Sequence, residues 1–194
     1  MIKSSDRSGW FGASDTSIIM GSWTTKTFAR FWAEKLGLIH NNFTTPQMQA
    51  GTHYEHRILE TIGIKQMDRQ IKIKELRLRI NYDGEDDSII HEVKTYGKKK
   101  FVLVKAYWQQ VQVEMFGAKK KCQIDAYRLL PEDYKNYFNP IDLKRLKFIP
   151  VEYSERWIIH EYLPREKILK DFLIRGEFPR IVPSEFVLRY GGKK

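Results

Sequence analysis

Residues 82–95 read Tyr-Asp-Gly-Glu-Asp-Asp-Ser-Ile-Ile-His-Glu-Val-Lys-Thr, a pattern that predicts two short strands around an acidic turn. Asp83-Gly84 closes the first strand, because glycine tolerates the backbone conformation that a turn often needs. The second strand is predicted to run from Ser88 to Thr95. Because side chains alternate across a strand, Glu92 and Lys94 fall on the same face.

Two carboxylates and an ammonium group are therefore expected to meet near this hairpin, namely those of Asp83, Glu92 and Lys94. Carboxylate oxygens suit Mg²⁺ or Mn²⁺, and a lysine beside them can position a water or help to deprotonate it. An edge strand with solvated charges is the alternative interpretation of the same pattern. The acidic residues 85–87 are predicted to lie in the turn and to face water, so they are not counted as ligands.

The composition is that of a globular protein with a basic charge. The chain has 194 residues, of which 42% are hydrophobic and 30% charged, and its net charge is +10. This length suits one domain with a real core, and the charge favours a polyanionic partner. A membrane surface is the competing partner. No stretch approaches the roughly 18 apolar residues of a membrane span, and residues 1–6 lack a signal-peptide core, so no membrane association is expected.

Cysteine usage indicates the compartment. Cys122 is the single cysteine of the sequence. An intramolecular disulfide and a four-cysteine zinc or iron–sulfur site made by one chain are therefore excluded. A reducing, cytoplasmic setting is expected.

Residues 7–21 predict a site that could attract an anion. A loop with two glycines leads to Ser14, which is expected to cap a short helix that ends at Gly21. Backbone N–H groups at a helix start attract anions, and Arg7 could bind a phosphate with two hydrogen bonds. From these residues alone, a capped helix with a surface arginine is the favoured alternative.

Two amphipathic helices are predicted before the strands. The first spans residues 25–37, and its aromatic residues favour core packing over base stacking. The second spans residues 45–62, with Pro46 in its first turn. Its apolar stripe comprises Met48, Gly51, Glu55, Ile58 and Ile62. A carboxylate such as Glu55 on a buried face needs a partner or a metal, and a glutamate that pairs with an arginine or reaches to the edge of the helix is equally compatible with the stripe.

A third helix is predicted from Val104 to Phe116, after a basic loop at residues 97–100 that either is solvated or contacts a nucleic-acid backbone. Its apolar stripe includes Tyr107, and polar residues such as Gln110 and Glu114 border this stripe. The remaining elements are predicted as a strand at residues 122–130, a polar connection with partial helix at 131–145, a hairpin of 148–153 with 156–162, a helix from Pro164 to Gly176 and an extended tail at 177–194.

Five short motifs resemble, in order, those of the lambda-type phage alkaline exonucleases, also called YqaJ-type viral recombinases. The motifs are Arg7-Ser8-Gly9 with Gly12-Ala13-Ser14, Gly51-Thr52-His53-Tyr54-Glu55, Asp83-Gly84, Glu92-Val93-Lys94, and Tyr107-Trp108-Gln109-Gln110-Val111-Gln112. They cover residues 7 to about 115, and after about residue 130 the resemblance is one of architecture.

The resemblance implies a fold and a set of roles. The fold would be a restriction-endonuclease-like α/β (α+β) core, a central mixed sheet flanked by helices, within one domain over residues 1–194. Asp83 and Glu92 would bind Mg²⁺ or Mn²⁺ directly, and the Val93 carbonyl would add a ligand. Glu55 would bind a second ion or its water shell, so that one or two ions occupy each site.

The same resemblance assigns the supporting groups and the substrate. Lys94 would orient the attacking water, with Gln110 and Tyr107 supporting it, and Arg7 and Ser14 would hold a 5′-phosphate. The implied activity is that of a magnesium-dependent hydrolase, a 5′–3′ exonuclease on linear double-stranded DNA that leaves 3′ tails for recombination. A homotrimeric ring and a single-strand annealing protein are the partners that the resemblance implies.

Two other functions remain open from the sequence. A restriction-type or RecB-like endonuclease could use the same core without Arg7 and Ser14. A non-catalytic DNA-binding module could retain the fold, although such a module has no need of an acidic cluster made by Asp83 and Glu92.

Overall fold

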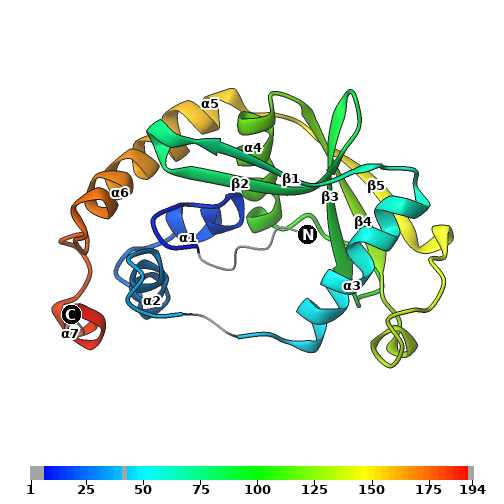
Figure 1. Ribbon diagram of the computed structural model, residues 1–194, viewed down its shortest axis with the longest axis horizontal. Coiled ribbons are helices and arrows are strands. Elements are labelled where there is room, and N and C mark those ends of the chain that lie inside the picture. The colour runs from blue at the N-terminus through cyan, green and yellow to red at the C-terminus, as the bar shows by residue number, and fades with distance from the viewer. Residues whose placement is uncertain (1–6, 41–42, 192–194) are drawn as a thin grey trace.

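The computed structural model describes residues 7–40 and 43–191, and its strands there form one five-stranded mixed sheet (Figure 1). The strands, in spatial as well as chain order, are β1 (Gln66–Ile73), β2 (Leu78–Glu85), β3 (Ile89–Tyr96), β4 (Lys121–Arg128) and β5 (Leu146–Val151). Neighbours are antiparallel except for the parallel pair β3–β4, which α4 connects. The predicted α/β class with a central mixed sheet is confirmed.

Some of the helices begin at a residue whose side chain caps them. The helices are α1 (Thr16–Ile19), α2 (Lys26–Lys35), α3 (Pro46–Thr61), α4 (Lys105–Ala118), α5 (Glu155–Trp157), α6 (Leu163–Arg175) and α7 (Ser184–Gly191). The hydroxyls of Thr25 and Thr45 accept hydrogen bonds from backbone N–H groups in the first turns of α2 and α3. None of the helices in the described ranges is long and apolar enough to span a membrane.

Helices α3 and α4 cover opposite faces of the sheet. Strand residues Val93 and Tyr127 pack into one hydrophobic cluster with α3, whereas Ile90 and Ile124 pack into the other cluster, which includes α4. Val93 and Ile90 are three residues apart on β3, and Tyr127 and Ile124 are three residues apart on β4. Residues at an odd spacing in a strand point to opposite faces of the sheet, so the two clusters lie on opposite faces. Residues on β3 therefore lie between the helix that carries Glu55 and the helix that carries Tyr107 and Gln110.

The predicted stripe on α3 was partly wrong. Its helix bounds match the prediction closely, but Met48 is 53% exposed, and the buried residues are Ala50, Tyr54, Ile58 and Leu59. The buried face is therefore rotated away from the predicted stripe, and Glu55 lies half-buried beside it.

The prediction that residues 85–87 all face water was wrong for Glu85. This residue ends β2, is 6% exposed, and forms ion pairs with Arg69 at 2.6 Å and Lys120 at 2.8 Å. These two ion pairs offset the free-energy cost of removing the Glu85 carboxylate from water. Asp87 is exposed, as predicted.

The predicted hairpin of residues 148–153 with 156–162 was also wrong, because β5 is followed by a helix. The Gln112 side chain donates to the Glu152 carbonyl and accepts from the Ser154 N–H, at 2.8 and 2.7 Å. Ser154 then caps α5 by accepting from the Trp157 N–H, and a π-helical segment, Ile158–Tyr162, continues into α6. These long-range and capping contacts override the local strand pattern.

The predicted extended tail was wrong as well, because residues 184–191 form α7. Pro183 provides the carbonyl that accepts hydrogen bonds from the N–H groups of Phe186 and Val187. The Trp32 indole donates to the Glu177 carbonyl at 2.8 Å, so the tail returns to the helix α2, as Figure 1 shows.

Candidate active site

The N-terminal loop of the described chain lies along β2. The Phe11 N–H donates to the Arg77 carbonyl and the Arg79 N–H donates to the Phe11 carbonyl, both at 2.8 Å. This short parallel pairing fixes the loop that follows Arg7 beside the strand that ends near Asp83. Two segments that are about 70 residues apart in the sequence are thereby brought to one place.

The predicted capping role of Ser14 was wrong. A short 3₁₀ turn, Ala13–Asp15, begins after Gly12, and the Asp15 carboxylate accepts a hydrogen bond from the Gly12 N–H at 2.7 Å. Asp15 also lies 2.5 Å from the buried Lys35 ammonium group. Ser14 is exposed instead, so its hydroxyl is available to the pocket described below.

Glu92, Lys94 and Gln110 form a tight hydrogen-bonded cluster. Oε1 of Glu92 accepts from Lys94 Nζ at 2.5 Å and from Gln110 Nε2 at 2.6 Å. Gln110 Oε1 accepts from Lys94 Nζ at 3.2 Å, which closes the triangle between β3 and α4. Burial acts to lower the pKa of Lys94, but the charges of Glu92 and Asp83 outweigh it and raise that pKa.

Asp83 and Glu55 complete an acidic centre. The Asp83 Oδ2 atom accepts from the Val93 N–H at 2.7 Å, which fixes Asp83 next to Glu92. Glu55 reaches the same centre from α3, because its carboxyl group interacts with those of Asp83 and Glu92. Burial, together with the neighbouring carboxylates, raises the pKa of both Asp83 and Glu55. The Val93 carbonyl as a ligand stays a prediction, since the recorded contact is through its N–H.

Tyr107 supports the lysine through its ring. The Lys94 ammonium nitrogen lies 5.1 Å from the centre of the Tyr107 ring, within the range of a cation–π contact. The ring of Tyr107 in turn stacks on Phe101, with centroids 6.2 Å apart.

Glu114 was missed as a member of this cluster. Its side chain is fully buried and its Oε1 atom accepts from Gln110 Nε2 at 2.8 Å. Burial first, and then the Glu92 charge, raise the pKa of Glu114 well above its ordinary value. The sequence placed this residue at the border of an apolar stripe, and its spacing of four residues from Gln110 on one helix is the signal that predicts their contact.

The acidic centre has the properties of a cation site. Within the described ranges, the Oε2 atoms of Glu92 and Glu114 are buried without a hydrogen-bond partner. Buried carboxylates that raise one another's pKa repel each other when ionised, and a divalent cation removes that repulsion. The residues present therefore fit Mg²⁺ or Mn²⁺, with Asp83, Glu92 and Glu55 as the available oxygen ligands.

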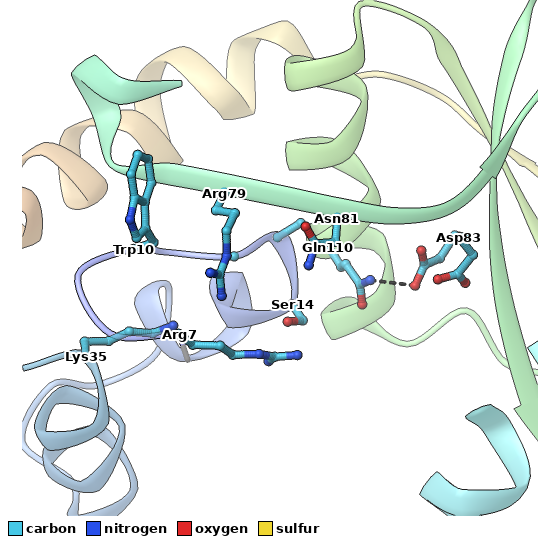
Figure 2. Close-up of a pocket in the computed structure, with 11 residues that line it drawn as sticks. Arg7, Trp10, Ser14, Lys35, Arg79, Asn81, Asp83 and Gln110 are labelled. Carbon is cyan, nitrogen blue, oxygen red and sulfur yellow. Dashed lines mark hydrogen bonds between the residues drawn. The ribbon is translucent and has the colours of Figure 1, made fainter. Parts of the chain in front are cut away.

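A pocket joins this acidic centre to the N-terminal loop (Figure 2). Its lining residues are Arg7, Trp10, Gly12, Ala13, Ser14, Lys35, Arg79, Asn81, Asp83, Glu92 and Gln110. Figure 2 shows Arg7 extending towards Ser14, with Arg79 and Asn81 on the β2 side and Asp83 at the far end. The pocket thus has guanidinium groups at one end and carboxylates at the other.

Arg79 and Asn81 are pocket residues that the sequence analysis missed. With Asp83 they occupy alternate positions of β2, and residues two apart in a strand point the same way. Counting back from Asp83 in steps of two therefore predicts that Asn81 and Arg79 lie on the same face of the strand as Asp83.

Comparisons with known proteins establish the fold. No protein-family model matches the chain, and no curated protein matches it. A solved structure of a phage-related exonuclease from Haemophilus somnus 129PT is 17% identical in sequence, with a TM-score of 0.64 over 86% of this chain and 95% of that one. Another, of a protein described as SSO0001, is 13% identical, with a TM-score of 0.50 over 87% of this chain and 77% of that one. The chain therefore has the fold of a phage-related exonuclease, as the resemblance implied.

Proposed function

We propose that this protein is a metal-dependent nuclease that degrades one strand of linear duplex DNA from its 5′ end. The single observation that carries the proposal is the pocket shared by Arg7 and Asp83. An anion held at the guanidinium end has a neighbouring phosphate within reach of the carboxylate end. The name of the phage-related exonuclease with this fold supports the same reaction class.

The chemistry at the acidic end follows from its charges. A bound Mg²⁺ or Mn²⁺ supplies a Lewis acid for the scissile phosphate and lowers the pKa of a bound water. Asp83, Glu92 and Glu55 hold the cation, and the Val93 carbonyl is available as a further ligand. Lys94, held by Glu92 and Gln110, directs an N–H towards the attacking water.

The phosphate end explains the choice of a DNA terminus. A terminal phosphate carries more charge than an internal diester, so it gains more from Arg7 and Arg79, with Ser14 and Asn81 as hydrogen-bonding neighbours. Water adds to phosphorus, the P–O3′ bond breaks, and a nucleotide leaves with a 3′-hydroxyl. The new end again carries a 5′-phosphate, so the same pocket can hold it for the next cut.

The surroundings of the site agree with a nucleic-acid substrate. The chain carries a net charge of +10, and phosphate contacts give affinity that depends on salt and little on sequence. A homotrimeric ring, a single-strand annealing partner and a cytoplasmic location complete the proposal. A restriction-type endonuclease would not need the guanidinium end of the pocket.

A digestion assay tests the proposal. Linear duplexes with a 5′-phosphate or a 5′-hydroxyl and a closed circular duplex are each incubated with wild type, Arg7→Ala and Arg180→Ala in Mg²⁺. We expect rapid loss of the 5′-phosphorylated duplex, slower loss of the 5′-hydroxyl duplex and no loss of the circle. Arg7→Ala should remove most of the difference between the two ends, and Arg180→Ala, which changes an exposed arginine outside the pocket, should keep it. Equal rates on both ends by wild type, or cutting of the circle, would favour an endonuclease.

A further inference from the structure

A second group of metal-ligating side chains lies beside the acidic centre. Glu55 and His56 belong to α3 and Asp68 to β1, and one ligand atom from each lies within 4.8 Å of the other two. His56 Nε2 is 3.1 Å from Asp68 Oδ1. Two ligands of one cation, each bonded at about 2.1 Å, are separated by a similar distance.

Asp68 departs from the regular geometry of β1. Pairing with β2 is recorded at Met67 with Gly84 and at Arg69 with Tyr82, and Asp68 between them has a φ of +53°. Aspartate is among the few residues that adopt this left-handed conformation readily. The departure accompanies the contact of Asp68 with His56 on the neighbouring helix.

The donor chemistry differs from that of the centre at Asp83 and Glu92. That centre offers oxygen atoms, which suit Mg²⁺, and it includes a lysine. The group at His56 offers one imidazole nitrogen and two carboxylates, and an imidazole nitrogen is a ligand typical of transition-metal sites, whereas Mg²⁺ sites use oxygen ligands. The side chains of His56 and Asp68 are 35% and 22% exposed, so an ion can enter and keep water ligands.

We propose that Glu55, His56 and Asp68 form a second site, beside the nuclease centre, for a divalent transition-metal cation that Mg²⁺ does not replace. Glu55 adjoins both centres, since its carboxyl group also interacts with those of Asp83 and Glu92. The site goes beyond the proposed nuclease activity, because its affinity for the cation does not require that DNA be cleaved. Without a cation, the His56–Asp68 contact is an ordinary hydrogen bond or ion pair.

Electron paramagnetic resonance of Mn²⁺ tests this site directly. Mn²⁺ is added to the full chain in the presence of a large excess of Mg²⁺, and bound Mn²⁺ and its coupling to nitrogen are measured. Wild type should retain one Mn²⁺ per chain with an imidazole nitrogen as a ligand. Loss of a residue that only hydrogen-bonds to a metal ligand lowers metal affinity by roughly 10-fold or more. His56→Ala and Asp68→Asn each remove a direct ligand, so each should lower the affinity for Mn²⁺ by at least as much, and His56→Ala should also abolish the nitrogen coupling.

Two controls separate this site from the rest of the protein. His53→Ala changes the other histidine of α3, which stacks on Tyr137 at 4.8 Å, and should keep the Mn²⁺ signal and the nitrogen coupling. Asp83→Asn disables the proposed nuclease centre and should also keep the Mn²⁺ site at His56. Far-ultraviolet circular dichroism establishes that each variant is folded.

The opposite results overturn the proposal in distinct ways. Complete displacement of Mn²⁺ by Mg²⁺ in wild type, or no nitrogen coupling there, would mean that His56 and Asp68 form an ion pair alone. Loss of the site in Asp83→Asn would mean that it is not separate from the nuclease centre. The measurement on wild type decides the question even where a variant fails to fold.

Discussion

Lys94 Nζ lies 2.5 Å from Oε1 of Glu92, two residues earlier on β3. The same carboxylate oxygen also accepts from Gln110, so Oε1 is committed to hydrogen bonds while Oε2 is buried without a partner within residues 7–40 and 43–191. Glu92 thus has one oxygen that positions the lysine and one that is suited to a cation.

Replacing Lys94 by alanine should slow DNA cleavage on the order of 10²-fold or more and leave DNA binding nearly unchanged. The variant keeps the cation ligands but loses the group that positions water. Asp83→Asn and Glu92→Gln should abolish cleavage by weakening cation binding. Initial rates in Mg²⁺ and DNA affinity without Mg²⁺ measure the two effects, with the exposed Lys121→Ala as control. Near-normal turnover by Lys94→Ala would contradict its assigned role.

Replacing Glu114 by glutamine should leave stability and cleavage nearly unchanged. Burial, and then the Glu92 charge, raise the pKa of Glu114 well above its ordinary value, so this carboxyl group keeps its proton to a higher pH than an exposed glutamate does. A glutamine amide has nearly the same shape and can accept the same hydrogen bond from Gln110. Glu114→Ala, by contrast, removes this contact and leaves a cavity, which should cost about 2–4 kcal/mol of unfolding free energy. Thermal melting and initial rates compare the two variants, and a loss in Glu114→Gln as large as in Glu92→Gln would mean that Glu114 is ionised.

The sequence predicted the site more fully than its surroundings. Helix α3 and the two strands of the acidic hairpin were predicted because caps, proline and alternation act locally. The predicted turn at Asp83-Gly84 was wrong, because β2 continues through these residues to Glu85 and Gly84 does not have a positive φ. The meeting of Glu55 with Asp83 and Glu92 came from the order of motifs. No local signal could show that Asp15, paired with Lys35, would displace Ser14 as the capping group.

The wrong hairpin has a similar cause. Residues 156–162 are rich in isoleucine and aromatic side chains, which favour a strand, but Gln112 on α4 holds the chain at Glu152 and Ser154, and the chain continues into α5. Such a contact spans about 40 residues, and a local window cannot detect it. The same limit hid Glu85, whose burial depends on Arg69 and Lys120.

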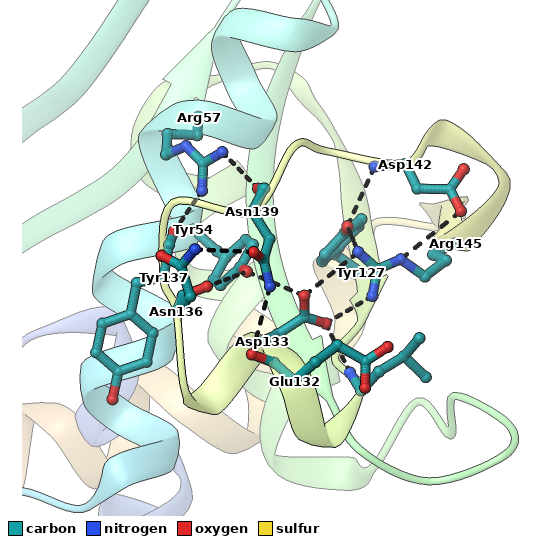
Figure 3. Close-up of polar contacts among 11 residues, drawn as sticks. Tyr54, Arg57, Tyr127, Glu132, Asp133, Asn136, Tyr137, Asn139, Asp142 and Arg145 are labelled. Atoms are coloured by element: carbon teal, nitrogen blue, oxygen red, sulfur yellow. Dashed lines mark hydrogen bonds and ion pairs between the residues drawn. The ribbon is translucent and has the colours of Figure 1, made fainter.

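Replacing Arg57 by alanine should lower the unfolding free energy by about 1.5–3 kcal/mol, or about 2–4 °C of melting temperature per kcal/mol. The Arg57 guanidinium donates to the backbone carbonyls of Tyr137 and Asn139 (Figure 3). It also donates to the Phe138 carbonyl, and these contacts anchor the β4–β5 connection to α3. Three carbonyls lose a charged donor in the variant. Thermal melting measures the loss.

Two further variants of arginine sharpen this test. Arg57→Lys keeps the charge but not the planar fork of donors, so it should recover only part of the stability. Arg175→Ala removes an exposed pair with Glu177 and should change stability by no more than about 0.5 kcal/mol. If Arg57→Ala melted like Arg175→Ala, the anchor would have no energetic role.

Replacing Glu166 by glutamine should make the protein more stable at alkaline pH and remove part of its pH dependence. Glu166 on α6 is fully buried, and neither carboxylate oxygen has a hydrogen-bond partner in the described part of the chain. Burial raises its pKa from 4.5 to about 8, although Lys170 and Lys167 act in the opposite direction. The folded state therefore keeps this proton to a higher pH than the unfolded state. It follows that the stability contributed by the protonated group is complete below about pH 4.5 and is lost as the pH rises to about 8, by on the order of 1 kcal/mol per pH unit.

Thermal melting of wild type and Glu166→Gln between about pH 5 and about pH 9 measures the effect. The two curves should diverge as the pH rises, whereas Glu161→Gln, an exposed neighbour, should remain parallel to wild type. Parallel curves for Glu166→Gln and wild type would show that Glu166 titrates alike in the folded and unfolded states.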